Sequence, residues 1–230
     1  MTQVAPFRSP AVTPIVRQKH AGEVVRWLIA PVVAHRRALL ALNVLYFGVA
    51  GVAAVYAFIN PTVQVELTKL AGEAFSPTGT LGPLIQAYVA GDLLGAIALT
   101  FLVNLFLGSA VVLTLPSAVV PFAGVLIGVY RAVLWGLLFA PTDASPLGAT
   151  LWLHVPTILI EGEAYVVAML GVWLWWRPVF DRSAERWRAW RSGLLFQVRI
   201  YATVAALLVL AAIYEGIEVI WVLSRLTPLT

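Results

Sequence analysis

Long apolar runs, separated by short polar or proline-containing stretches, dominate the pattern of the chain. A transmembrane helix needs about 20 mostly apolar residues, and a turn cluster such as PTDASPLG at 141–148 marks the end of one run. The apolar run over 84–140 is too long for one crossing. We expect it to fold back at LPSAVVP, where Pro116 and Pro121 disfavour a continuous helix. The pattern predicts five spans, near residues 38–59, 84–113, 118–140, 149–176 and 200–223.

The composition supports an integral membrane protein. Of 230 residues, 61% are hydrophobic and only 11% are charged, whereas about a quarter of the residues of a soluble domain are charged. The mean hydropathy is +0.90. We therefore expect an all-α polytopic helical bundle with about five transmembrane helices and additional interfacial amphipathic helices. The expected organisation is a basic N-terminal segment (1–37), one transmembrane domain (38–223) and a short tail (224–230).

Basic residues gather in two places, which set the expected topology. Six Lys or Arg residues lie in segment 1–37, and six arginines lie in 177–199. Cytoplasmic loops are enriched in Lys and Arg, so both segments are expected inside. The N-terminus is then cytoplasmic, the C-terminus is outside, and loops 61–83 and 141–148 are outside. No cleaved signal peptide is expected, because a long apolar core does not follow a short basic start.

The two basic segments are each expected to form an interfacial helix. Residues 22–35 mix apolar and basic positions, and Trp187 and Trp190 lie among the arginines of the second segment. Because each basic cluster adjoins a span, its expected partner is the anionic lipid headgroup rather than nucleic acid.

The residue types exclude several kinds of chemistry. The chain contains no cysteine, which removes disulfides, thiolate metal sites and cysteine nucleophiles. It also contains no phosphate-binding loop, no zinc-binding His-Glu helix motif and no serine nucleophile elbow. We expect no catalytic site, no metal and no cofactor. His154 is a weak candidate for ligation of haem or a pigment, and a hydrogen bond to a neighbour is its more ordinary role.

Eight polar side chains within the apolar runs are the candidate site. An ionisable group inside a span costs a few kcal/mol and marks a functional hypothesis by default. Arg131 is the one strongly basic group well inside a span, so we expect it to face a carboxylate. The predicted buried polar core comprises Asp92, Asn104, Arg131, His154, Glu161, Glu163, Glu215 and Glu218.

The two glutamates of IEGEAY cannot serve one site. At about 100° per residue, positions 161 and 163 are about 200° apart on a helix. Glu161 shares a face with small residues suited to close helix packing, and Glu163 points elsewhere, toward a partner that this chain need not supply. The predicted small-residue packing positions are Gly124, Gly128, Ala164, Ala168 and Gly171.

The last two predicted spans resemble those of the stage II sporulation protein M family. The family pattern of a histidine, then Glu-x-x-Ala, a further alanine and a glycine is matched by His154, Glu161, Ala164, Ala168 and Gly171. The sequence AALLVLAAIYEGIE, with Glu215, resembles the family's last span, and Asn104 with AGVLIG resembles its central spans. The resemblance implies a multi-span protein of a prokaryotic cytoplasmic membrane, without chemistry of its own. The best-described relatives act as scaffolds for a peptidoglycan-degrading complex.

Three functional hypotheses follow. The first is a non-enzymatic membrane subunit or scaffold that assembles with partner membrane proteins or with itself. The second is a transporter or an ion- or proton-conducting component, in which the buried glutamates would face a hydrated cavity. The third is an accessory subunit of a light-harvesting or respiratory complex, which would carry a pigment.

Overall fold

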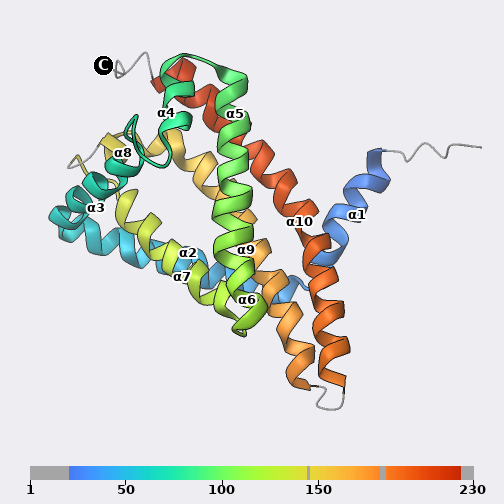
Figure 1. The fold of residues 1–230 in the computed structure, drawn as a ribbon. Coiled ribbons are helices and arrows are strands. Elements are labelled where there is room, and N and C mark those ends of the chain that lie inside the picture. Colours follow the sequence, from blue (N-terminus) through green and yellow to red (C-terminus); the bar gives the residue numbers. More distant parts are fainter. Residues whose placement is uncertain (1–20, 144–145, 182–184, 224–230) are drawn as a thin grey trace, which may run out of the picture.

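The computed structural model describes residues 21–143, 146–181 and 185–223, and every regular element within these ranges is a helix (Figure 1). The predicted all-α helical bundle is confirmed. The elements are α1 (Ala21–Ala34), α2 (Arg36–Ile59), α3 (Pro61–Ala74), α4 (Gly82–Val89), α5 (Leu93–Leu102), the π-helical segment η1 (Val103–Thr114), α6 (Leu115–Val119), α7 (Ala123–Leu138), α8 (Pro146–Ala149), α9 (Leu151–Asp181), α10 (Arg186–Ile217) and the π-helical segment η3 (Glu218–Leu223).

Four helical stretches in the described ranges are long and apolar enough to cross a membrane. They are Arg36–Ile59, Leu93–Val119, Leu151–Asp181 and Arg186–Leu223. The third predicted span, near 118–140, corresponds to α7, which has 16 residues. At 1.5 Å per residue α7 is about 24 Å long, shorter than the hydrocarbon core of about 30 Å. The apolar pattern therefore located five helices, of which four have spanning length.

The second span differs from its predicted limits at both ends. It begins at Leu93, because Gly91 adopts a left-handed conformation (φ 70°) that separates α4 from α5. The predicted break at LPSAVVP is confirmed, because the helix ends at Val119 within it, but the predicted span end at residue 113 is six residues too early, since the helix continues through Pro116. Pro116 lies in the first turn of α6, after the π-helical segment, where a proline is tolerated. The chain turns only at Phe122, whose φ is 59°.

The basic segment before the last span is not a separate interfacial helix. It is the first part of α10, which runs without interruption from Arg186 to Ile217. The stretch from 186 to 199 contains no proline and only one glycine, so nothing in it ends the helix. The fourth span is also longer than predicted, because α9 continues past residue 176 to Asp181 despite Pro178.

Helix α9 is the centre of the bundle. Two thirds (67%) of its most apolar stretch is buried, against 17% for α2 and 28% for each of the other two spanning stretches. Figure 1 shows α9 and α10 as a long hairpin, with α5 to α6 alongside and α2 packed on α7. The core around α9 is continuous, with Tyr165, Val166, Val167, Ala168, Met169 and Leu170 all at most 1% exposed.

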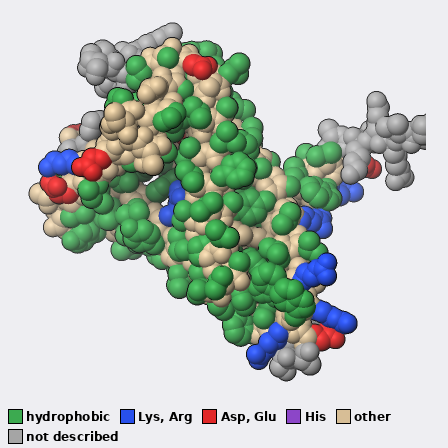
Figure 2. Space-filling view, in the orientation of Figure 1, with side chains coloured by type: hydrophobic (Ala, Val, Ile, Leu, Met, Phe, Trp, Pro, Cys, Tyr) green, Lys and Arg blue, Asp and Glu red, His purple; other side chains and the backbone are tan. Residues whose placement is uncertain are grey.

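The outer surface has the character of a membrane-facing surface. Figure 2 shows hydrophobic side chains over most of the visible face, with most Lys and Arg along its right and lower edge and a few at its left end and near its middle. Exposed Val44 and Leu94 illustrate the apolar cover on α2 and α5. Because water-soluble bundles place charged groups over such faces, this distribution supports a membrane-embedded protein.

Candidate functional site: a buried polar network

The tyrosine of α9 joins the central polar residues. The Tyr165 hydroxyl donates to Glu161 Oε1 one turn earlier on α9, and it also lies 3.1 Å from Asn104 Oδ1 on η1. Tyr165 is fully buried and Glu161 is 6% exposed. This phenol therefore links α9 and η1 through a buried hydrogen bond to Glu161 and a partly buried one to Asn104.

Arg131 contacts the same tyrosine from α7. Its guanidinium carbon lies 4.1 Å from the centroid of the Tyr165 ring, and its Nη1 donates to the Gly108 carbonyl at 3.2 Å. The predicted direct pairing of Arg131 with a carboxylate is not observed among the described residues. Tyr165 thus contacts the cation through its ring face and Glu161 through its hydroxyl.

The π-helical segment η1 provides the carbonyl that Arg131 uses. A π-helix bonds i to i+5 and is wider than an α-helix, and such segments are frequent at functional sites. In η1 the Asn104 carbonyl accepts from Ser109 Oγ at 3.1 Å, and the Gly108 carbonyl accepts from Arg131. Gly108 also leaves room for Tyr165, whose hydroxyl would lie 3.0 Å from a Cβ at this position. Local helix geometry thus places the polar backbone against the arginine.

A second group of polar side chains lies near the end of the bundle formed by α4 and η3. The Tyr88 hydroxyl donates to Glu215 Oε1 at 3.0 Å and shares a 2.7 Å hydrogen bond with Thr100 Oγ1. Glu161 is close enough to Glu215 to interact with it electrostatically. The central and end groups therefore lie within electrostatic reach of each other, and together they are called the polar network below.

His154 belongs to the same end of the molecule. Its Nδ1 lies 2.6 Å from Glu218 Oε1, and the two side chains are 12% and 3% exposed. Its ring also packs edge-on against Phe139 at 5.9 Å. The histidine thus has a carboxylate partner within the chain, in agreement with its more ordinary predicted role.

Two predicted core residues lie outside this network. Asp92 is exposed and caps α5, where its Oδ1 accepts from the Gly95 amide at 3.0 Å. An aspartate at this position satisfies a free amide of the first turn, so its prediction as a buried group is wrong. Glu163 is half-buried and accepts from Asn43 Nδ2 of α2 at 3.4 Å. This chain therefore supplies a partner for Glu163, contrary to the prediction.

The small residues lie where helices meet. A Cβ on Gly128 would come within 2.9 Å of Met169 Cγ, and one on Gly171 would come within 2.8 Å of the Gln197 amide carbon. Gly124 donates its amide to Ser117 Oγ at 2.7 Å. Ala164 and Ala168 are fully buried. All five predicted packing positions are therefore at helix contacts.

A third polar group, toward the basic end, was not predicted. Gln197 Nε2 donates to Thr114 Oγ1 at 3.1 Å, and Thr114 shares a 2.7 Å hydrogen bond with the Tyr201 hydroxyl. Trp176 donates its indole N–H to the Ser117 carbonyl at 2.6 Å. These uncharged groups do not stand out in an apolar sequence. For Tyr165, its spacing of four from Glu161 was an available signal.

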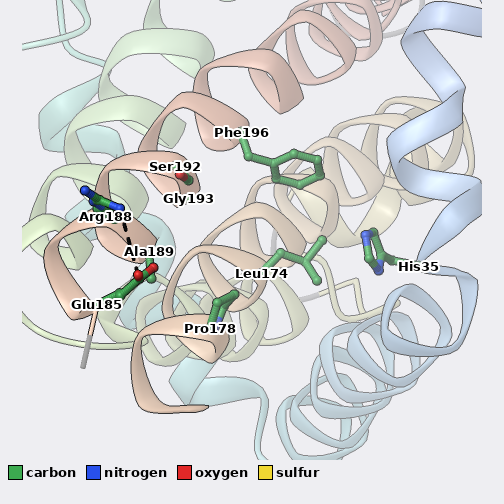
Figure 3. A pocket seen from close by; sticks show the side chains of 9 residues that line it. All are labelled: His35, Leu174, Pro178, Glu185, Arg188, Ala189, Ser192, Gly193 and Phe196. Carbon is green, nitrogen blue, oxygen red and sulfur yellow. Dashed lines mark ion pairs between the residues drawn. The ribbon is translucent and has the colours of Figure 1, made fainter. Parts of the chain in front are cut away.

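Among the cavities that border the described helices are two that neither Glu161 nor Glu215 lines. The larger, about 540 Å³, lies at the basic end; Figure 3 shows His35 at one end of it, Arg188 and Glu185 at the other, and the apolar Leu174, Pro178 and Phe196 between. The smaller, about 220 Å³, is an apolar groove between α2, α7 and α9.

The ligand chemistry of the network is limited. No three His, Asp or Glu side chains within the described ranges are arranged to hold a metal ion. The functional groups of the network are hydrogen-bond and proton donors and acceptors, namely carboxyl groups, phenols, one imidazole and one guanidinium.

Comparisons with protein-family models, curated proteins and solved structures found no match to this chain. The resemblance to the stage II sporulation protein M family stays a prediction.

Proposed function

We propose that this protein is a non-enzymatic, multi-span subunit of a prokaryotic cytoplasmic membrane, which assembles with partner membrane proteins through the outer face of α2. The N-terminus and the α9–α10 loop would be cytoplasmic and the C-terminus outside. The basic segments would contact anionic headgroups. One observation carries the assembly proposal: Gly48 and Gly51 lie in the spanning helix α2 and face open space, as Gly22 of α1 and Gly72 of α3 do outside the spanning helices, whereas eight glycines at helix crossings are covered.

Glycines mark helix contacts throughout the bundle. A Cβ added to any of eight helical glycines would come within about 3 Å of another part of the chain. At Gly136, for example, it would lie 2.7 Å from the Ala53 Cβ of α2. Small residues allow helix backbones to approach closely in a membrane. The covered glycines are Gly108, Gly124, Gly128, Gly136, Gly162, Gly171, Gly193 and Gly216.

Gly48 and Gly51 depart from this rule. A Cβ on either would meet nothing within 4 Å, and both glycines are exposed. Glycine costs about 1 kcal/mol relative to alanine inside a helix, so an uncovered pair in one helix needs another use. Exposed Val44 and Val55 lie on the same face by helical periodicity. The face is free of charge, as a contact with another apolar transmembrane helix requires.

The interior network supports a structural role for most of the buried polar groups. Tyr165 joins α9 to η1, Tyr88 joins α4 to α10, and Gln197 joins α10 to η1. Interhelical hydrogen bonds in membranes contribute about 0.6 kcal/mol each on average. Together they hold α4, α9, α10 and η1 in fixed rotation, and the Asn43–Glu163 hydrogen bond joins α2 to α9, which sets the direction in which the face of α2 points.

The test is co-purification in mild detergent followed by mass spectrometry. We expect wild-type chain to retain membrane partners or additional copies of itself, and the double variant Gly48→Leu/Gly51→Leu to lose them. Val198→Leu is the matched control, because Val198 is 64% exposed on α10 and the change also adds volume there. Equal recovery of partners by the α2 variant and the wild type would contradict the proposal.

Glu161→Gln separates this proposal from the transport alternative. If the network only fixes helix rotation, the variant should weaken partner recovery. Unchanged recovery, together with altered ion or proton flux in proteoliposomes, would favour a transporter. Absorbance of the purified protein tests the third hypothesis, an accessory subunit of a light-harvesting or respiratory complex, because a colourless preparation contradicts it.

A further inference from the structure

The acids of the network, which are the buried Glu161 and Glu218 and the half-buried Glu215, outnumber the available cations. Glu161, Glu215 and Glu218 face at most two positive charges, those of Arg131 and of His154 when protonated. At least one carboxyl group is thus left without a compensating cation. A bare carboxylate buried away from water is strongly disfavoured and is neutralised instead. In the described part of the chain no set of three ligands can hold a metal ion, so a proton is the neutralising species.

Two further side chains show that the site has unused hydrogen-bonding capacity. Glu218 Oε2 is buried and has no hydrogen-bond partner, although Oε1 faces His154. Thr157 Oγ1 is also buried without a partner, in a residue that is 6% exposed. Thr157 lies one turn from His154 and one turn from Glu161, on the same face of α9. A buried polar atom without a partner costs about 1–3 kcal/mol, which a proton on the carboxyl group can offset by becoming a donor.

Helix α4 covers this site. Tyr88 places its hydroxyl on Glu215 and Thr100, and Leu84 and Ala87 pack with Val219 and Ile220 of η3. In Figure 1, α4 lies beside the end of α10 where η3 begins. The arginine-rich α9–α10 loop is cytoplasmic by the positive-inside rule. The end covered by α4 is the opposite one, which is therefore outside. Protons would therefore enter from the outer side, past α4.

We propose that Glu218, Glu215 and His154 form a proton-binding site beneath α4, with Glu161 as its inner member. A proton from outer water binds a carboxylate oxygen of the pair Glu215 and Glu218 and returns to water when it is released. No other species is consumed. The site goes beyond the proposed assembly function, since it can bind a proton whether or not a partner is present.

Groups from all the helices packed around this site act on its proton. The titratable and charged groups are Tyr88 of α4, Arg131 of α7, His154, Glu161 and Tyr165 of α9, Glu215 of α10, Glu218 of η3, and Tyr46 of α2. Arg131 contacts the Gly108 carbonyl and the Tyr165 ring. Its charge therefore stays beside these groups and does not move to Glu215 and Glu218. Deprotonation would place two carboxylates close together near Glu161, and like charges repel.

The direct measurement is infrared difference spectroscopy of the full chain in lipid nanodiscs, on lowering the pH through the neutral range. We expect a protonated-carboxyl C=O band to appear in the wild type and to be lost in the double variant Glu215→Gln/Glu218→Gln. Glu66→Gln is the control for a surface acid, because Glu66 is exposed and pairs with Lys69 on α3. Glu163→Gln is the control for an acid inside a span. Both controls should retain the band.

A band of equal size in the double variant would overturn the proposal. So would sodium binding with no carboxyl band in the wild type. If the double variant does not fold, Tyr88→Phe serves as the second test, because it keeps all the acids and removes the donor to Glu215. The wild-type C=O band should then shift in frequency, and an unshifted band would also overturn the proposal.

Discussion

The Tyr165 hydroxyl is the atom whose removal tests the central network most directly. Tyr165→Phe deletes the donor to Glu161 and the contact with Asn104, but it keeps the ring under Arg131. A buried acceptor left without its donor costs about 1–3 kcal/mol. Asn104 also interacts with Glu161 and remains, which places the expected loss in the lower part of that range, at about 1–2 kcal/mol in the free energy of unfolding.

The assay is reversible unfolding in mixed micelles of mild detergent and dodecyl sulfate, followed by tryptophan fluorescence. Tyr130→Phe is the matched control, because Tyr130 is 61% exposed on α7 and its hydroxyl has no part in the network. It should leave the free energy of unfolding within about 0.5 kcal/mol of wild type. Tyr165→Leu also removes the ring and its cation–π contact, and it should cost about 3–5 kcal/mol.

Two results would refute this reasoning. If Tyr165→Phe and Tyr130→Phe have the same free energy of unfolding, the hydroxyl does not join the helices. If Tyr165→Leu costs no more than Tyr165→Phe, the ring does not support Arg131. A double-mutant cycle between Tyr165→Phe and Asn104→Ala measures the coupling itself, for which we expect about 0.5–1.5 kcal/mol.

Two further predictions concern packing and topology. Gly136→Ala should lower the free energy of unfolding by about 1–3 kcal/mol, because its Cβ would collide with the Ala50 carbonyl group; Gly51→Ala, which has open space, should be neutral or stabilising, and equal effects in thermal unfolding would contradict the packing. Because the chain lacks cysteine, single cysteines report topology without background. A membrane-impermeant thiol reagent should label Lys69→Cys in intact cells and Arg186→Cys only after permeabilisation, and labelling of both in intact cells would contradict the orientation.

The apolar pattern was sufficient for the helical class and for the approximate position of each helix. It could not place the helix ends, because these depend on single residues whose effect is conformational. Pro116 predicts a break in the helix, yet it follows a π-helical segment and lies in the first turn of α6, where the helix accommodates it. The arginines before residue 200 predicted a separate interfacial helix, yet nothing in them stops α10. Polarity alone does not show whether a basic helix is separate from the span that follows it.

The site was predictable in its acids but not in its connections. Periodicity correctly separated Glu161 from Glu163, and the cost of burial selected Glu161 and Glu218, which are buried, together with Arg131 and Glu215, which are half-buried. Neither argument could show that one tyrosine contacts both the cation and the acid, because aromatic side chains are common in apolar spans and carry no distinctive signal. Asp92 was misassigned because its cap depends on where α5 begins, and sequence places helix ends least well.

The length of the α9–α10 hairpin determines how the protein fits its bilayer. With 38 residues, α10 and η3 together measure about 57 Å. Even at a tilt of about 40°, the steep end of the usual range, they cover about 44 Å, which equals the bilayer with its headgroups. Both ends therefore reach water at any ordinary tilt. Thinner or thicker membranes are matched by tilting this pair, so hydrophobic mismatch would not restrict the protein to one membrane thickness.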